Sequence, residues 1–238
     1  MKRYLAVLLV LLLLPCLAQA EQVREIDWSK PVVAITFDDG PSQYTLSILE
    51  TLEEYGCRAT FFMLGNRMGS YKEVVEAVAA SENEIGTHTW SHKKLSELGS
   101  AGVKLELNEG IKRIKELTGR ETRFLRPPYG AVSNKVYSYC VQNKMVVVNW
   151  SLGSDDWRTT SAKDVADTIL SRVQSGDIIL CHDTLEHTAE AMKTVIPELV
   201  ARGYQVLTLT EIFSGYEEEL VSTGKYSRMY PERVKEQK

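Results

Sequence analysis

The feature that most constrains the fold is an alternation of short apolar runs with longer segments of helical periodicity. The runs of strand length are 32–36, 59–63, 84–87, 124–126, 145–148, 178–181 and 205–207. The segments with apolar residues at helical spacing are 45–55, 71–80, 101–118, 134–142, 163–172 and 189–201. Strands that alternate with helices are typical of a parallel sheet, because each helix returns the chain to the same edge.

This alternation predicts an α/β fold in a single domain. The chain has 238 residues, of which 44% are hydrophobic and 25% charged, enough for one large core. Two architectures remain open at this point, a doubly wound sheet and a closed barrel. No glycine-rich phosphate fingerprint follows the first strand, so the dinucleotide-binding version of the open sheet has no support. In either architecture, reactive residues belong at the carboxyl ends of the strands.

The first twenty residues differ from the rest of the chain. Lys2 and Arg3 precede an apolar run from Leu5 to Leu14, Pro15 breaks this run, and Ala18-Gln19-Ala20 offers a small-x-small cleavage site. Residues 1–20 are therefore predicted to be a secretory signal peptide, which implies a secreted or extracytoplasmic protein. An uncleaved N-terminal membrane anchor is the alternative, although the apolar run is short for a span.

The charge balance excludes a general affinity for nucleic acid. The chain has 28 Lys and Arg against 32 Asp and Glu, and cleavage after residue 20 would remove two of the basic residues, leaving a net charge of about −6. No basic surface is expected from such a balance. Cys57, Cys140 and Cys181 lie in apolar stretches, where buried thiols are expected rather than a disulfide framework. Polar segments 21–29 and 214–238 are expected to flank the domain as a lead and a peripheral or partly disordered tail.

Titratable or rigid residues follow five of the predicted strands. These segments are Asp38-Asp39-Gly40-Pro41, His88 directly after Thr87, Arg126-Pro127-Pro128-Tyr129-Gly130, Ser154-Asp155-Asp156-Trp157 and Leu180-Cys181-His182-Asp183. The opposite ends of the strands carry ordinary turn residues. A functional site is therefore predicted at the carboxyl edge of the sheet.

Two of these segments are ambiguous when taken alone. The chain has four histidines, and His88 and His92 share the stretch GTHTWSH. A spacing of i, i+4 on a helical turn would aim both rings at one metal, yet a pair of exposed loop histidines explains the stretch equally well. Asp38-Asp39 could simply begin a turn, and a phosphatase-type aspartate pair would need one residue between the two carboxylates.

Taken together and in order, the motifs TFDDGP, HTxxH, RPPYG, DDW and LCHD resemble those of the polysaccharide deacetylase family, the NodB-like domain or carbohydrate esterase family 4. The resemblance covers roughly residues 30–213. It implies a distorted (β/α) barrel with seven or eight parallel strands and one divalent metal ion, usually Zn²⁺. Family members hydrolyse acetyl groups from N-acetylglucosamine polymers, or less often O-acetyl groups from xylan.

The resemblance also assigns the main chemical roles. Asp39, His88 and His92 resemble the metal ligands, a set that leaves coordination positions open for catalysis. Asp38 resembles the general base that takes a proton from the attacking water. His182 resembles the general acid that protonates the leaving amine.

Three further residues are expected to support these groups. The backbone N–H of Tyr129 should stabilise the oxyanion, Arg126 should pair with Asp38, and Asp156 should favour the charged form of His182.

Trp157 and Leu180 resemble residues that form the pocket for the acetyl methyl group, with ordinary core packing as the alternative. His187 matches no motif and is expected to have no role. Gly153 and Cys181 depart from the residues that the family usually has there, which affects the expected shape of the groove rather than the reaction.

Peptidoglycan is the leading expected substrate, because the predicted location is extracytoplasmic. Chitin oligomers and acetyl-xylan are the alternatives. A non-enzymatic sugar-binding relative should lack the base, the acid or a ligand, and all of these are present. An amidohydrolase barrel should show an HxH pair after its first strand, and this chain does not. A monomer without stable membrane insertion after signal cleavage is expected.

Overall fold

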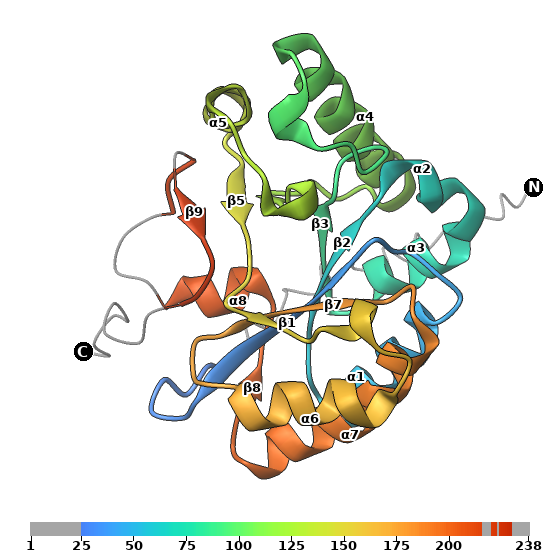
Figure 1. Ribbon diagram of the computed structural model, residues 1–238, viewed down its shortest axis with the longest axis vertical. Coiled ribbons are helices and arrows are strands. Elements are labelled where there is room, and N and C mark those ends of the chain that lie inside the picture. The colour runs from blue at the N-terminus through green and yellow to red at the C-terminus, as the bar shows by residue number, and fades with distance from the viewer. Residues whose placement is uncertain (1–24, 216–219, 223, 230–238) are drawn as a thin grey trace, which may run out of the picture.

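The computed structural model describes residues 25–215, 220–222 and 224–229. The predicted signal peptide and residues 21–24 of the predicted lead lie outside these ranges. Among the described helices, none has the length and apolar character needed to span a membrane. Strands and helices alternate in a single α/β domain, as the sequence predicts (Figure 1).

All seven predicted strands and all six predicted helices are present, with ends shifted by a few residues. The strands are β1 (Val32–Asp38), β2 (Thr60–Met63), β3 (Glu84–Thr87), β4 (Phe124–Leu125), β5 (Val146–Val148), β6 (Leu152–Gly153), β7 (Ile178–His182), β8 (Gln205–Val206) and β9 (Lys225–Tyr226). The helices are α1 (Thr45–Glu54), α2 (Gly65–Met68), α3 (Lys72–Ala80), α4 (Ser100–Thr118), α5 (Asn134–Asn143), α6 (Ala162–Arg172), α7 (Glu186–Ala201) and α8 (Leu209–Ser214). The unpredicted elements β6, β9, α2 and α8 are too short to show a clear period.

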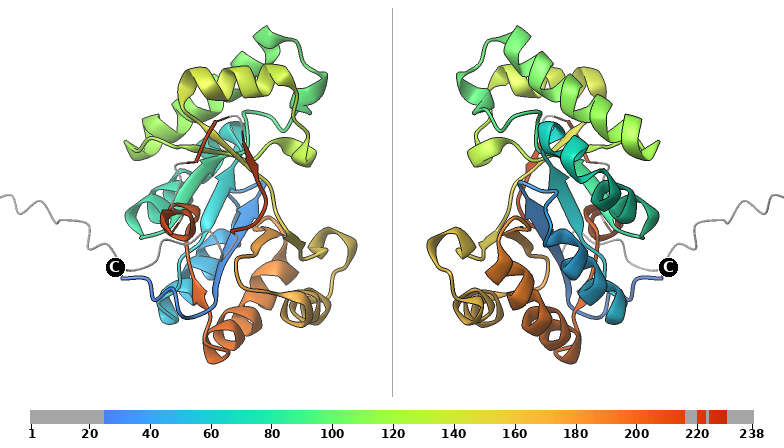
Figure 2. Two further views of the ribbon diagram at one scale, coloured as in Figure 1. Left: turned by 90° about the vertical axis from the view of Figure 1, so that its left-hand side faces the viewer. Right: turned by 90° about the vertical axis from the view of Figure 1, so that its right-hand side faces the viewer.

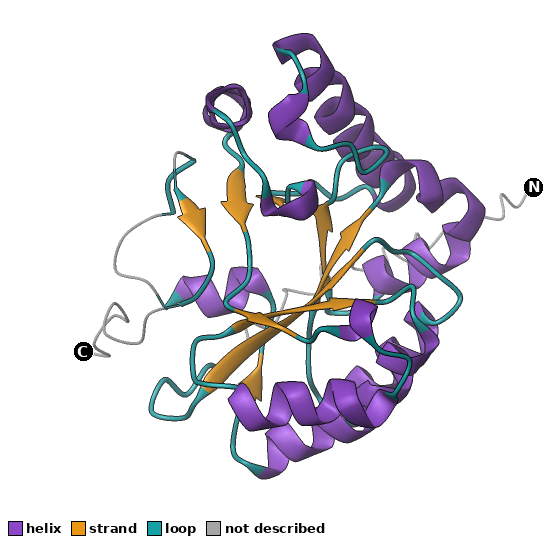
Figure 3. Cartoon of the chain, viewed as in Figure 1, coloured by secondary structure: helices purple, strands orange, loops and turns teal. Residues whose placement is uncertain are grey.

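The strands form one curved sheet in the order β6-β7-β1-β2-β3-β4-β5-β9 (Figure 3). Every pairing between these strands is parallel, and β8 pairs with the first residues of β1. Strand β9 comes from the segment predicted as a tail, and it extends the sheet beyond β5. Helices surround the sheet, which confirms the predicted distorted (β/α) barrel.

The sheet is buried on both faces. Val33, Ile35 and Phe37 of β1 pack in a cluster with residues of α1, α6 and α7 on the outer side. Val32 and Ala34 point to the inner side and pack in a second cluster, to which α8 contributes. Helix α8 lies across the sheet from α6 and α7 (Figure 2). Burial on both faces explains why β1 reads as a continuous apolar run rather than an alternating one.

The remaining predicted core features are also present. Helices α4 and α5 pack on β4 and β5 through a third apolar cluster, which includes Leu107, Leu125 and Val136. The three cysteines in the described part of the chain are all buried, as expected, and Cys140 and Cys181 are free thiols.

Candidate active site

The inner face of β1 becomes polar at its carboxyl end. Alternate residues of a strand point to one side, so Thr36 and Asp38 follow Val32 and Ala34 on the inner face. Both polar side chains are buried and therefore need partners. Parallel pairing sets Asp38 opposite His182 of β7. The fold thus places the predicted base and the predicted acid on neighbouring strands.

Arg126 provides the positive charge for this polar end. Its side chain is fully buried, and Nη1 donates to Asp38 Oδ1 at 2.9 Å and to Thr36 Oγ1 at 2.8 Å. Nε donates to the carbonyl oxygen of Val148 at 3.0 Å and Nη2 to that of Asn149 at 2.9 Å. A buried ion pair is tolerated only when further hydrogen bonds satisfy both partners, and here four acceptors surround one guanidinium.

Asp39, His88 and His92 converge although they follow two different strands. Asp39 Oδ1 lies 3.4 Å from Nε2 of His88 and 3.3 Å from Nε2 of His92. One ligand atom from each residue lies within 4.8 Å of the others. Asp39 Oδ1 is buried and has no hydrogen-bond partner among the described residues. An unsatisfied carboxylate oxygen that faces two imidazole nitrogens fits a divalent cation.

The protonation states suit such a cation. Nδ1 of His88 lies 2.7 Å from the carbonyl oxygen of Arg126, which can only accept, so Nδ1 is the donor and Nε2 is the nitrogen left to face a cation. Burial and the neighbouring His88 lower the pKa of His92, which favours its neutral form. Burial opposes the charge of Asp39, but the three nearby histidines outweigh it and lower its pKa to about 2.

His88 and His92, the predicted ligand histidines, lie on a turn and not on the helical turn that their spacing suggested. Thr89 and His92 adopt positive φ angles of 74° and 62°, and the rings of His88 and His92 come within 4.9 Å between centroids. Non-glycine residues with positive φ are uncommon and cluster at functional sites. Glu106 of α4 holds this turn, because Ser91 donates its N–H to Oε2 at 2.8 Å and its hydroxyl to Oε1 at 2.6 Å.

His182 is held by Asp156 in two ways. Its Nδ1 lies 2.8 Å from Asp156 Oδ1, and its backbone N–H donates to Oδ2 at 2.7 Å. Thr188 also donates to Oδ2, at 2.9 Å. Burial opposes the charged imidazole, but the hydrogen bond and charge of Asp156, with the charges of Asp38 and Asp39, raise the pKa of His182 to about 9. Its Nε2 faces the predicted metal ligands, 4.0 Å from Asp39 Oδ2.

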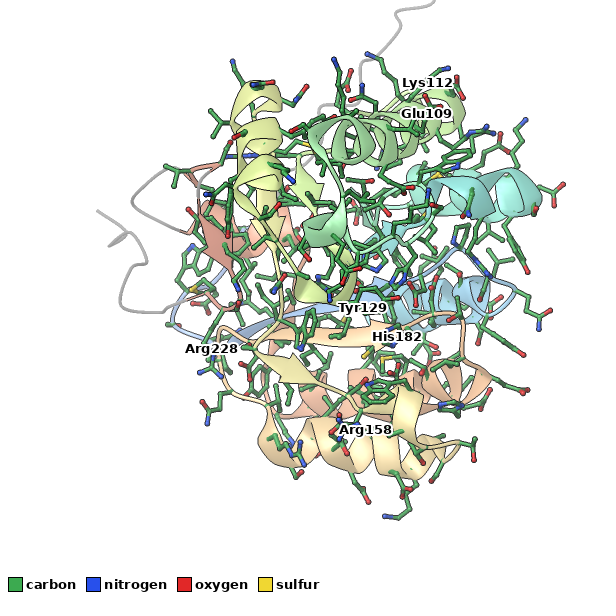
Figure 4. The ribbon with its side chains drawn as sticks, turned by 45° about the horizontal axis from the view of Figure 1, so that its top comes forward. Glu109, Lys112, Tyr129, Arg158, His182 and Arg228 are labelled. Carbon is green, nitrogen blue, oxygen red and sulfur yellow. The ribbon has the colours of Figure 1, made fainter. Side chains whose placement is uncertain are left out.

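Tyr129 lies directly beside His92, one of the predicted metal ligands. Its φ angle is 60°, and its ring contacts that of His92 edge-on at 4.8 Å between centroids. The turn is fixed by backbone hydrogen bonds from Gly130 and Ala131 to the carbonyl oxygens of the two preceding prolines. Figure 4 shows Tyr129 close to His182. The backbone N–H of Tyr129 is therefore held in a rigid turn at the edge of the site.

The two predicted pocket residues differ in burial. Leu180 is buried on the inner face of β7, one alternation before His182. Trp157 is 63% exposed, so the core-packing alternative fails for it. Its ring lies under the guanidinium of Arg158, with Cζ 4.4 Å from the ring centroid. A role of either residue in forming the acetyl pocket stays a prediction.

Two buried acids near the site were not predicted. Glu106 could have been found, because it shares the buried face of α4 with Val103 and Leu107, where a charge needs a specific partner.

His187, which matched no motif, approaches the carbonyl oxygen of Asp156 through Nε2 at 2.8 Å. This contact supports the turn behind His182 and does not reach the metal ligands.

Asp183 is the second unpredicted acid. Thr45 donates to its Oδ2 at 2.5 Å, and burial raises the pKa of Asp183 to about 7. A Cβ at Gly40 would lie 2.3 Å from the same oxygen, so only glycine fits above this carboxyl group. Asp183 thus fills the space beneath the turn that carries Asp39. Its position after His182 was visible in the sequence, but its neighbours were not.

The family model described as polysaccharide deacetylase matches residues 25–148. The peptidoglycan-N-acetylmuramic acid deacetylase PdaC of Bacillus subtilis is 34% identical over 79% of this chain and 40% of the relative. A peptidoglycan-N-acetylglucosamine deacetylase of Bacillus cereus is 30% identical over 78% of this chain and 70% of the relative. The chain therefore spans less than half of the first relative and about two thirds of the second.

Solved structures agree with these relatives. A T48 deacetylase with substrate superposes with a TM-score of 0.79 at 30% identity and covers 85% of this chain and 100% of its own. A family 4 acetyl xylan esterase from Clostridium thermocellum, solved with a cobalt ion, superposes with a TM-score of 0.77 at 31% identity over 83% of this chain and 98% of its own. With the matched family model, the shared fold and the converging motifs, the chain belongs to the polysaccharide deacetylase family.

Proposed function

We propose that this protein is a metal-dependent N-deacetylase that removes acetyl groups from an N-acetylglucosamine-containing polysaccharide. One arrangement carries the proposal: Asp38 and His182 are paired in register on adjacent strands, and the Asp39 cluster lies beside both. Amide hydrolysis needs a base for the attacking water and an acid for the leaving amine on either side of the carbonyl. This geometry supplies both groups around one candidate metal position.

The metal ligands in this proposal are Asp39, His88 and His92, with Zn²⁺ as the proposed ion because such sets leave catalytic positions open. When bound, a divalent ion polarises a carbonyl oxygen and lowers the pKa of water toward about 7. Asp38 accepts the proton of the attacking water. Arg126 keeps Asp38 aimed at the site through its 2.9 Å hydrogen bond.

Stabilisation of the oxyanion and protonation of the leaving nitrogen are the proposed roles of Tyr129 and His182. The rigid N–H of Tyr129 donates to the developing oxyanion, where a preorganised donor has its largest effect. His182 donates the proton on Nε2 to the leaving nitrogen, which would otherwise depart as an unstable anion. Asp156 keeps His182 charged for this step and fixes the ring through Nδ1.

Peptidoglycan is the proposed substrate, supported by the names of the relatives from Bacillus subtilis and Bacillus cereus. The predicted signal peptide supports a secreted or extracytoplasmic, cell-wall-associated monomer. Chitin oligomers are an alternative polymer with the same acetamide. Acetyl-xylan is a second candidate, favoured by the structural similarity to the Clostridium thermocellum esterase.

The test measures acetate and free amine released from peptidoglycan, chitin oligomers and acetyl-xylan under identical conditions. Each reaction is run with the purified protein, after chelation, and after Zn²⁺ is restored. Release of amine that chelation abolishes and Zn²⁺ restores is expected with peptidoglycan. Acetate release from acetyl-xylan alone would identify an esterase, and activity unaffected by chelation would refute the metal-dependent mechanism.

A further inference from the structure

A stacked cation lies beside the proposed acid. In the turn Asp155–Arg158, which precedes α6, the guanidinium of Arg158 covers the exposed ring of Trp157 at 4.4 Å from Cζ to the centroid. A guanidinium over an aromatic face is held there by the ring's quadrupole and by stacking of the two planes. Arg158 is therefore more ordered than a typical surface arginine, although its side chain is 62% exposed.

This pair is close to the reaction centre. Asp156, from the same turn, binds both Nδ1 and the backbone N–H of His182. Figure 4 shows His182 between Tyr129 on one side and Arg158 on the other. A polysaccharide bound over His182 would therefore extend past Arg158 in one direction and past Tyr129 in the other.

The guanidinium of Arg158 is available to a ligand. Asp155 Oδ1 lies 3.7 Å from its Nε, beyond hydrogen-bond distance, and Asp155 Oδ2 lies 3.7 Å from Nη1 of Arg172. One carboxylate is thus shared by two guanidinium groups, which leaves one positive charge in excess. In the described part of the chain, the side chain of Arg158 makes no hydrogen bond.

The geometry points to Arg158 as a specificity-determining residue that binds a carboxylate on the polysaccharide strand, beside the acetamide that is hydrolysed. This inference rests on the proposed deacetylase function and deepens it. A guanidinium matches a carboxylate with two parallel hydrogen bonds, whereas a chain built only from N-acetylglucosamine is uncharged. Peptidoglycan offers carboxylates from two sources, the lactyl ether of its muramic sugars and the peptide attached to that group.

The experiment compares kcat/KM on four substrates of equal length. They are a neutral chitin oligomer, a peptide-free oligomer with free lactyl carboxylates, the same oligomer with those carboxylates amidated, and an oligomer carrying its peptides. The variants are Arg158→Gln, Arg158→Lys and the control Arg202→Gln. Arg202 is paired with Glu198 at the far end of α7, so its loss removes the same charge away from the site.

We expect Arg158→Gln to lower kcat/KM about five- to tenfold on carboxylated substrates, mainly through KM, because the contact is remote from the reacting bond. The neutral oligomer should change less than about twofold, and Arg158→Lys should keep part of the preference. Loss confined to the free lactyl oligomer assigns the carboxylate to the sugar, and loss confined to the peptide-bearing oligomer assigns it to the peptide. Both results support the inference.

Equal effects of Arg158→Gln on neutral and carboxylated oligomers, or no effect on either, overturn the inference. Metal content and the thermal midpoint show whether the variant is folded, and Arg158→Lys provides a second test if the glutamine variant is not. A wild-type protein that releases no acetate from any substrate refutes the proposed function itself. A wild-type protein that is active on all four substrates without preference refutes only the role of Arg158.

Discussion

Replacing Asp156 by Asn tests how His182 stays protonated. The pKa of His182 is raised from 6.5 to about 9 against the effect of burial, and Asp156 is the largest source of this rise. Without that carboxylate, the charged imidazole is stabilised less strongly against the effect of burial, and the pKa of His182 should fall to about 6.5 or below. At pH 8 the protonated fraction would drop roughly 30-fold, whereas at pH 6 it would change less than about twofold.

The assay follows kcat for N-deacetylation from pH 5 to pH 10. Because the acid must be protonated, the alkaline limb of the wild type should lie near the pKa of His182, and Asp156→Asn should move it to lower pH. The amide of Asn cannot replace both oxygens, since Oδ2 accepts the backbone N–H of His182. Some loss that is uniform across pH is therefore expected, and the ratio of the losses at pH 8 and pH 6 isolates the effect of charge.

Two comparisons complete this test. Thr188→Val removes one donor to Asp156 but keeps the carboxylate, so its alkaline limb should stay near that of the wild type. An acetate ester with a good leaving group needs little acid and should be hydrolysed by Asp156→Asn almost normally at pH 8. The reasoning is refuted if the variant loses the same factor at pH 6 and pH 8, or loses ester hydrolysis as severely as amide hydrolysis.

Three other predictions concern the metal, the base and the turn that Glu106 holds. The wild type should bind about one divalent ion per chain, and His88→Ala should lose both ion and activity; full metal content by elemental analysis would contradict the ligand assignment. Asp38→Asn should keep the ion but lose turnover by a factor of at least ~10², while Asp39→Asn should weaken metal binding first; the reverse pattern would exchange their roles. Glu106→Ala leaves the two donors of Ser91 unpaired and should lower the free energy of unfolding by about 1–3 kcal/mol in urea; an unchanged value would show that the turn is held otherwise.

The sequence was sufficient to predict elements with a long or repeated pattern. Strand β1 is a long apolar run, and the helices between α1 and α7 that exceed two turns repeat their apolar residues over many positions. The order of these elements, and with it the parallel sheet, therefore follows from the sequence. Strands of two residues, such as β6 and β9, carry no period at all. Their pairing with β7 and β5 depends on backbone contacts between segments far apart in the chain.

In the site, too, some features could be predicted from the sequence and others could not. The positions of the reactive residues at strand ends were predictable from the residue pattern, whereas only the resemblance to the family placed Asp38 and Asp39 in the same site. Adjacent strand residues point to opposite faces, which would send one carboxylate away from the site. The φ angle of 70° at Asp39 breaks this alternation, so that Nε2 of His88 lies within 3.9 Å of Asp38 Oδ2 and 3.4 Å of Asp39 Oδ1. Sequence spacing carries no sign of this backbone conformation.

Arg126 contacts both Asp38 and His88, and so it fixes the position of these two residues relative to each other. Its guanidinium binds Asp38, while its carbonyl oxygen accepts the Nδ1 proton of His88. One residue therefore fixes both the position of the proposed base and the tautomer of a proposed metal ligand. The hydrogen bonds to the carbonyl oxygens of Val148 and Asn149 tie this residue to the end of β5. The carbonyl oxygens of Val148 and Asn149 lie at the end of β5, on the far side of the curved sheet from β1. The sheet must therefore curve far enough to bring the end of β5 to Arg126, or Asp38 at the end of β1 and His88 after β3 would lose their shared partner.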